Sequence, residues 1–333
     1  MEKNVQSRKD FLDLDCEAET NRIKHEIQHI ISKKLKKRGV VVGLSGGIDS
    51  SVTVALCRQA IGNERVLALL MPEVHSSDDT LDLSRMVADH FGVEFIYEEI
   101  TGILEAFGFY KRYNAAVQSI IPEYGKDWKS KIVTSNIIDG RGFTFFTVVA
   151  KSPEGNEVKK RLDVKSYLSV VAATNFKQRV RKTLEYYHAD RLNYAVAGTP
   201  NRLEYDQGFF VKNGDGAADF KPIAHLYKSQ VYKLAKYLGV PDEIIQRPPT
   251  TDTYSLSQDQ DEFYFALPYQ KMDLCLYGKN NHIPAETIAS LTGLTSEQVN
   301  SVYKDIDQKR STTKYLHLPP VLVEKVPEIS YPL

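Results

Sequence analysis

The chain has 333 residues, of which 42% are apolar and 26% charged, and its formal net charge is zero. This composition allows a large buried core and excludes a long disordered segment. A neutral chain has no long-range attraction to nucleic acid or anionic membranes, and no apolar run is long enough to span a bilayer. Three separated cysteines, Cys16, Cys57 and Cys275, form no metal-binding pattern and indicate a reducing compartment. We therefore expect a single α/β domain over residues 1–333, located in the cytoplasm.

The first third of the chain alternates helical and extended patterns. The predicted elements are a helix over 23–35, a strand over 40–44, a helix from residue 50, a strand over 66–70, a helix over 78–90 and a strand over 93–97. Strands that alternate with helices predict a doubly wound parallel sheet with flanking helices. In such a sheet the ligand binds at the carboxyl ends of the strands.

Regular alternation stops between residues 101 and 164. Two β-rich runs, 142–151 and 156–162, flank a turn-like segment at 152–155 and predict a β-hairpin. We interpret 102–165 as an insertion. Four roles remain open for it: a lid, an interface element, part of the acid-substrate pocket or a packed surface hairpin. The elements predicted beyond it are helices over 175–189, 226–238 and 296–308 and a strand over 194–199, with a polar, proline-punctuated segment before the last helix.

The most informative segment is the loop 43–51, Gly-Leu-Ser-Gly-Gly-Ile-Asp-Ser-Ser, between a strand and a helix. Glycines let backbone N–H groups approach an anion, and the N-terminus of the following helix favours negative charge. The two common phosphate-loop patterns are absent. Asp49 would repel a polyphosphate unless a metal ion lay between them, which predicts Mg²⁺ bound jointly by protein and nucleotide. A simple capped turn needs one polar residue, whereas this loop supplies several.

The loop resembles the SGGxDS loop of the ATP pyrophosphatases, which cleave ATP between its α and β phosphates. Further motifs follow it in order: NxxxRxR at 175–181, GTxxxxE at 198–204, FFxKxGDGxxD at 209–219, then Lys228 and Pro249-Thr250. Together they resemble the ammonia-dependent NAD synthetases, which amidate deamido-NAD through an acyl-adenylate and release NAD, AMP and pyrophosphate.

The resemblance implies roles for individual residues. ATP, the co-substrate, would be held by Gly43, Leu44, Ser45, Gly46, Gly47, Ile48, Asp49, Ser50, Met71, Thr199, Lys228 and Thr250. The cofactor Mg²⁺ would be held by Asp49 and Glu204, and deamido-NAD by Arg179, Lys212, Asp219, Gln308 and Lys309. The catalytic residues it implies are Asp49, Lys228, Ser45 and Ser50, which stabilise the charge of departing pyrophosphate.

The resemblance also implies a homodimer. Only 39 residues precede the first predicted strand, too few for a glutaminase domain, so ammonia is expected to come free or from a separate partner protein. Neither a nucleic acid nor a membrane is expected as a partner.

Three features depart from the family pattern. Gln308 replaces the usual His, the insertion precedes Asn175, and residues 205–207 are bulkier and more polar than expected. All three lie on the acid-substrate side. One alternative is therefore an adenylating amide ligase that acts on a sugar acid or a nucleotide-linked acid. A second is a non-catalytic nucleotide-binding regulator. Transfer-RNA thiolation is disfavoured by the neutral charge and the lack of paired cysteines.

Overall fold

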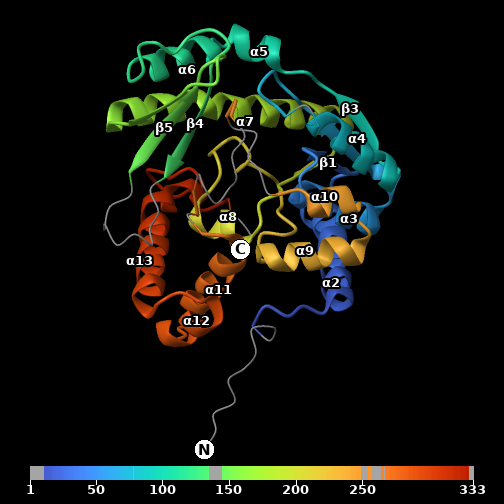
Figure 1. Ribbon diagram of the computed structural model, residues 1–333. Coiled ribbons are helices and arrows are strands. Elements are labelled where there is room, and N and C mark those ends of the chain that lie inside the picture. The colour runs from blue at the N-terminus through green and yellow to red at the C-terminus, as the bar shows by residue number, and fades with distance from the viewer. Residues whose placement is uncertain are drawn as a thin grey trace, which may run out of the picture.

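The computed structural model describes residues 11–77, 79–134, 145–248, 254–256, 264–265 and 267–329. Within these residues the central sheet has four parallel strands in the order β3-β2-β1-β7 (Figure 1). The strands are β1 (Val40–Gly43), β2 (Val66–Leu70), β3 (Glu94–Tyr97) and β7 (Ala195–Ala197). Val41, in the middle of β1, pairs with Leu67 on one side and Val196 on the other. The predicted parallel α/β sheet is confirmed.

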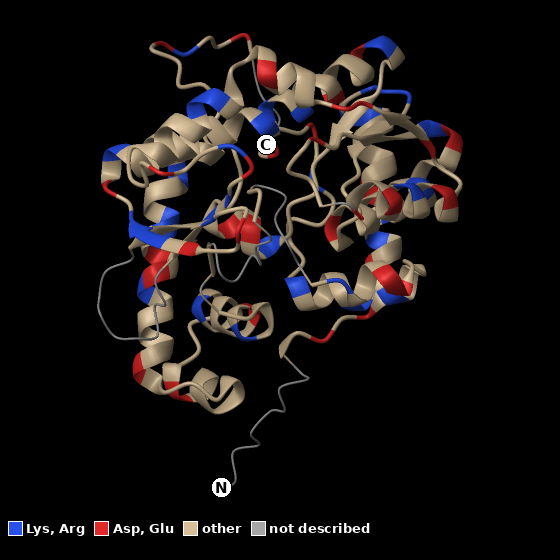
Figure 2. Cartoon of the chain, turned by 45° about the horizontal axis from the view of Figure 1, so that its top comes forward, with Lys and Arg blue, Asp and Glu red and all other residues tan. Residues whose placement is uncertain are grey.

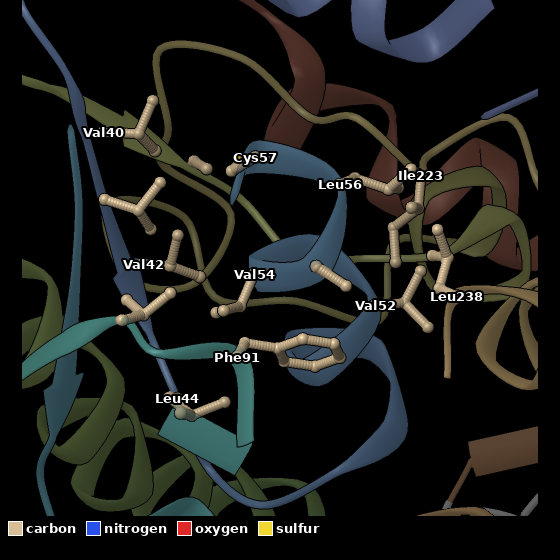
Figure 3. Packing of buried hydrophobic residues seen from close by; sticks show 14 of the residues in the cluster. Val40, Val42, Leu44, Val52, Val54, Leu56, Cys57, Phe91, Ile223 and Leu238 are labelled. Carbon is tan, nitrogen blue, oxygen red and sulfur yellow. The ribbon is translucent and has the colours of Figure 1, made fainter. Parts of the chain in front are cut away.

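One face of the sheet packs against helices that carry apolar residues at helical spacing. These helices are α2 (Cys16–His29) with its π-helical extension (Ile30–Lys34), α3 (Ile48–Ile61), α4 (Thr80–Phe91), α9 (Lys228–Leu238) and α10 (Asp242–Gln246). Val40 and Val42 of β1 share this core with Val52 and Val54 of α3 (Figure 3). Successive strand residues point to opposite faces, so Val41 belongs to the core on the other side.

The second face is covered by α5 (Thr101–Ala106), α6 (Phe109–Gln118) and the long helix α7 (Val164–Leu192). Helix α7 begins at Val164, well before the predicted start at 175, because Asp163 caps it by accepting a hydrogen bond from Ser166 N at 2.8 Å. The earlier start extends the helix toward the predicted insertion. A single helix therefore contacts both β1 and α6.

The predicted hairpin is confirmed and belongs to a larger unit. Within the described residues, β4 (Lys129–Thr134), β5 (Phe146–Lys151) and β6 (Glu157–Arg161) form an antiparallel sheet in that order. Strand β4 was not predicted. Ile132 and Val148 face each other across β4 and β5, and both are completely buried in the core that α6 and α7 share. That residues 102–165 are an insertion remains a prediction.

The polar, proline-punctuated segment before the last predicted helix contains α10 and two longer helices, α11 (Tyr269–Asn280) and α12 (Ala285–Thr292). The C-terminal part is formed by α11, α12 and α13 (Ser296–Thr313), together with the short helix α8 (Arg202–Gln207). A 3-10 turn (Lys314–His317) follows α13. Two of its prolines, Pro268 and Pro284, stand directly before α11 and α12 as their N-cap residues. A proline at a helix start loses no intrahelical hydrogen bond.

Charge is distributed evenly over the fold. Figure 2 shows basic and acidic residues interspersed along the helices rather than gathered on separate halves of the chain. Among the described helices, none has the length and apolar character required to cross a membrane.

Candidate functional site

A cavity of about 410 Å³ lies at the carboxyl ends of β1 and β2. Its walls come from the loop after β1, the segment after β2, the middle of α7, the start of α8 and the start of α9. The predicted ATP and metal residues in its wall are Gly43, Leu44, Ser45, Gly47, Ile48, Asp49, Ser50, Met71, Thr199, Glu204 and Lys228. These residues are far apart in the sequence, and the parallel sheet brings them to one edge.

The loop after β1 is shaped by its own residues. Gly46 has φ +68°, and a Cβ there would lie 2.8 Å from Leu83 Cβ, so this glycine allows the loop to pack on α4. Ser50 Oγ donates to Gly47 O at 3.0 Å and accepts from Ser45 N at 3.3 Å. Gly47 is the N-cap of α3 and offers no side-chain cap. The N–H groups of the first turn therefore suit an anion in the cavity.

Charged side chains meet beside this loop. Lys228, the first residue of α9, is only 2% exposed, and its Nζ donates a hydrogen bond to Asp49 Oδ2. Asn201 Nδ2 donates to Asp49 Oδ1 at 3.2 Å. The backbone N of Asn201 also donates to Glu204 Oε2 at 3.1 Å, as part of the capping box that starts α8. Asn201 thus connects two carboxylates from different helices, and Lys228 pairs with one of them.

The electrostatics of this group favour an additional cation. Burial, reinforced by the negative charge of Asp49, raises the pKa of Glu204 to about 8. Burial alone would lower the pKa of Lys228, but Asp49 and Glu204 outweigh it and raise this pKa above its usual range. A raised pKa means that Glu204 tends to hold a proton beside Asp49, and a divalent cation can take the place of that proton.

The donor set fits magnesium that is shared with a nucleotide. Mg²⁺ prefers oxygen ligands and is usually bound by one or two carboxylates together with substrate phosphates. Among the described residues, no group of three or more His, Cys, Asp or Glu side chains is arranged to hold a metal ion by itself. Asp49 and Glu204 thus suit a metal ion that arrives with ATP.

Sequence reasoning missed several residues of the cavity wall. Arg181 Nε donates to Met71 O at 3.2 Å, although the motif at 175–181 predicted no role for Arg181. Lys182 and Glu185 form a buried ion pair of 2.6 Å. A Lys and a Glu three residues apart on a helix look like a surface pair in the sequence, so their pattern gave no signal. Asp215, inside a quoted motif, also lines the cavity.

Two aromatic residues extend the wall toward the antiparallel sheet. Phe146 of β5 and Tyr167 of α7 stack with ring centroids 4.1 Å apart, and both line the cavity. The predicted insertion, residues 102–165, therefore contributes Phe146 to the wall of this cavity. Its role stays a prediction.

The predicted acid-substrate residues lie outside the cavity wall as far as the described residues define it. Lys212 Nζ donates to the carbonyl oxygens of Tyr315 at 2.8 Å and Leu318 at 3.3 Å, and Arg179 Nε donates to Lys212 O at 3.3 Å. These two residues lie together, next to the turn after α13. Their role in substrate binding remains a prediction.

Two of the other three predicted acid-substrate residues, Asp219 and Lys309, make structural contacts. Asp219 Oδ2 accepts from Val196 N at 2.8 Å and anchors its loop to β7. Lys309 pairs with Asp305 at 2.7 Å, and Gln308 lies beside it on α13. The predicted ATP contact Thr250 lies outside the described residues.

Comparison with known proteins identifies the family of this chain. The family model described as NAD synthase matches residues 19–137 and 120–315. The chain belongs to the NAD synthase family. The chain is 56% identical to the protein named NH(3)-dependent NAD(+) synthetase of Rhizobium meliloti (strain 1021) over 320 residues, which is 96% of each chain. It is 35% identical to the protein of the same name from Thermotoga maritima over 257 residues, which cover 76% of this chain and 85% of the relative.

A solved NAD synthetase has the same fold. The structure of the NH3-dependent NAD synthetase from Campylobacter jejuni aligns with a TM-score of 0.61 and 24% identity, covering 93% of this chain and 100% of that one. The family membership and this fold confirm the resemblance inferred from the sequence motifs.

Proposed function

We propose that this protein is an ammonia-dependent NAD synthetase that amidates deamido-NAD at the expense of ATP. The observation that carries the proposal is the meeting of buried Lys228 with the half-buried carboxylates Asp49 and Glu204 beside a phosphate-binding loop, in a chain of the NAD synthase family. A regulator that only binds a nucleotide does not need a buried lysine between two carboxylates. Stabilising a leaving pyrophosphate does require a positive charge.

The chemistry explains why a cation is placed there. A carboxylate oxygen of the acid attacks the α-phosphorus of ATP, and the bond from that phosphorus to the bridging oxygen breaks, so that pyrophosphate leaves. Ammonia then attacks the acyl carbon, AMP leaves with the former carboxylate oxygen, and one proton is released to give the amide. We assign to Lys228 the stabilisation of charge on pyrophosphate, and to the Ser45 and Ser50 hydroxyls and the loop N–H groups the binding of phosphate oxygens. Mg²⁺, when bound with ATP, would supply electrostatic stabilisation of the same charge.

Other parts of the proposal rest on the family pattern. We propose that Met71 reads adenine through its backbone, that Asp49 and Glu204 hold Mg²⁺, and that Arg179 and Lys212 bind deamido-NAD. We also propose that the enzyme works in the cytoplasm as a homodimer, with ammonia taken free or from a separate protein. A monomeric mass in light scattering at working concentration would contradict the dimer.

The proposed function is tested by incubating the full chain with Mg-ATP, ammonium and deamido-NAD and quantifying every product. Equal amounts of NAD, AMP and pyrophosphate are expected. The control is a parallel panel of sugar acids and nucleotide-linked acids under the same conditions. Pyrophosphate release that depends on one of these acids, without NAD formation from deamido-NAD, would contradict deamido-NAD as the substrate. ATP binding with no turnover on any acid would support the regulator instead.

A further inference from the structure

A carboxylate of α7 lies beside the first residue of the phosphate loop. A Cβ built on Gly43 would lie 2.9 Å from Glu185 Oε1 and 3.5 Å from Met71 Cε. Gly43 begins the phosphate-binding loop, and Met71 marks the proposed adenine end. Glu185 therefore lies between the two ends of the nucleotide site, and the ribose is the part of a nucleotide that joins base to phosphates.

Glu185 is held in a fixed orientation. Its side chain is 8% exposed, and Lys182, which is 7% exposed, donates from Nζ to Glu185 Oε2 at 2.6 Å. Among the described residues, the other oxygen, Oε1, accepts no hydrogen bond. Both side chains line the cavity. A buried ion pair contributes little net stability because desolvation offsets the attraction, but here it directs one carboxylate oxygen toward Gly43.

We propose that Glu185 reads the ribose of ATP, with Oε1 accepting hydrogen bonds from the 2′- and 3′-hydroxyls, and that Lys182 is the positioning residue for this carboxylate. The proposal rests on the proposed function, since it requires ATP in this cavity. An acidic side chain takes the same role in dinucleotide-binding folds, where it accepts a hydrogen bond from the ribose 2′-hydroxyl. The negative charge of Glu185 would also repel a phosphate group, so the triphosphate is directed along the loop toward Lys228.

The first experiment measures binding of ATP, 2′-deoxy-ATP and 3′-deoxy-ATP to the full chain by calorimetry, without any acid substrate. We expect the wild-type protein to bind at least one deoxy analogue about 10- to 100-fold more weakly than ATP, as for a lost hydrogen bond to a charged group. The double variant Lys182→Met with Glu185→Leu removes both charges together and leaves no unpaired buried ion. It should bind ATP as weakly as the wild type binds the analogue, with no preference among the three nucleotides.

The matched control is the double variant Lys165→Met with Asp190→Asn, whose sites are exposed on the same helix. It should keep the wild-type preference, and thermal melting of both variants checks that they are folded. Wild-type affinities equal within about twofold for all three nucleotides, or a preference retained in the Lys182/Glu185 variant, would overturn the assignment. Either result, with NAD still formed from ATP, would leave the proposed function intact. Failure of the chain to bind ATP at all would overturn both.

The positioning role of Lys182 has its own measurement. Lys182→Met alone should raise KM for ATP and weaken the ribose preference with little change in kcat, because Glu185 is still present but loses both its buried partner and its fixed orientation. Lys182→Arg can still donate to Glu185 Oε2 and should restore the preference. A Lys182→Met variant with unchanged ribose preference would contradict the positioning role.

Discussion

Lys228 Nζ donates a hydrogen bond to Asp49 Oδ2 and thereby joins the first residue of α9 to the first turn of α3. Both helices pack on the same face of the sheet, so the fold delivers a cation and a carboxylate to the end of β1. The buried ammonium is kept charged by Asp49 and Glu204. A cation that cannot lose its proton at neutral pH suits the stabilisation of developing phosphate charge.

Replacing Lys228 by Met should therefore reduce turnover more than substrate binding. We expect kcat to fall by at least about 100-fold, as for other losses of a group that stabilises transition-state charge, with a much smaller change in KM for ATP. The measurement is steady-state kinetics of NAD formation. Lys236→Met, at an exposed position of the same helix, is the matched control and should behave as wild type. A Lys228 variant with unchanged kcat would contradict the assigned role.

Replacing Asp49 by Asn should weaken the response to magnesium. Loss of one proposed carboxylate ligand is expected to raise the Mg²⁺ concentration for half-maximal rate by at least about 10-fold. The check is a magnesium titration of activity at fixed ATP, with Asp89→Asn on the exposed side of α4 as control. Full activity of Asp49→Asn at limiting Mg²⁺ would exclude Asp49 as a ligand.

Replacing Lys212 by Met should affect the acid substrate. Lys212 is held by the Tyr315 and Leu318 carbonyl oxygens, which leaves one donor for an anionic ligand. Its loss is expected to raise KM for deamido-NAD by about 10-fold, the value of one charged hydrogen bond, with kcat nearly unchanged. Kinetics at varied deamido-NAD, with exposed Lys236→Met as control, measure this. A fall in kcat alone would argue against a binding role.

His75 predicts an acid-sensitive contribution to stability. Burial, with further repulsion from Lys177, lowers the pKa of His75 from its ordinary value of 6.5 to about 4. The folded state therefore disfavours protonation of the His75 imidazole. The stability from keeping His75 neutral is complete above pH 6.5 and is lost as pH falls toward 4. The difference between the two pKa values corresponds to about 3 kcal/mol of stability, which is lost as the pH falls from 6.5 to 4.

The measurement for His75 is urea unfolding at pH 7 and at pH 4.5. The free energy of unfolding of His75→Gln should fall less between these two pH values than that of wild type. His25→Gln, at an exposed position of α2, should follow the wild type. An equal loss of stability in wild type and His75→Gln would show that this histidine does not titrate as described.

Local patterns predicted the central sheet and the phosphate loop because both depend on residues close together in sequence. Val-rich strands and the loop at 43–51 carry their own signals. Strand β4 carries two lysines among its six residues, and it forms only because β5 lies beside it. The burial of the Lys182–Glu185 pair is likewise not indicated by the sequence, because it results from the packing of α7 on β1. Strand pairing and burial that depend on segments far apart in the sequence cannot be predicted from local sequence patterns.

The proposed reaction passes through an acyl-adenylate formed at the Asp49–Lys228 site, and the transfer of oxygen from the acid to AMP tests this most directly. Deamido-NAD labelled with ¹⁸O in its nicotinate carboxylate is converted with Mg-ATP and ammonium, and AMP, pyrophosphate and NAD are examined by mass spectrometry. We predict that one carboxylate oxygen appears in the phosphate of AMP and none in pyrophosphate. NAD formation with label in inorganic phosphate and ADP as product, or with no label in AMP, would contradict attack of the acid on the α-phosphorus.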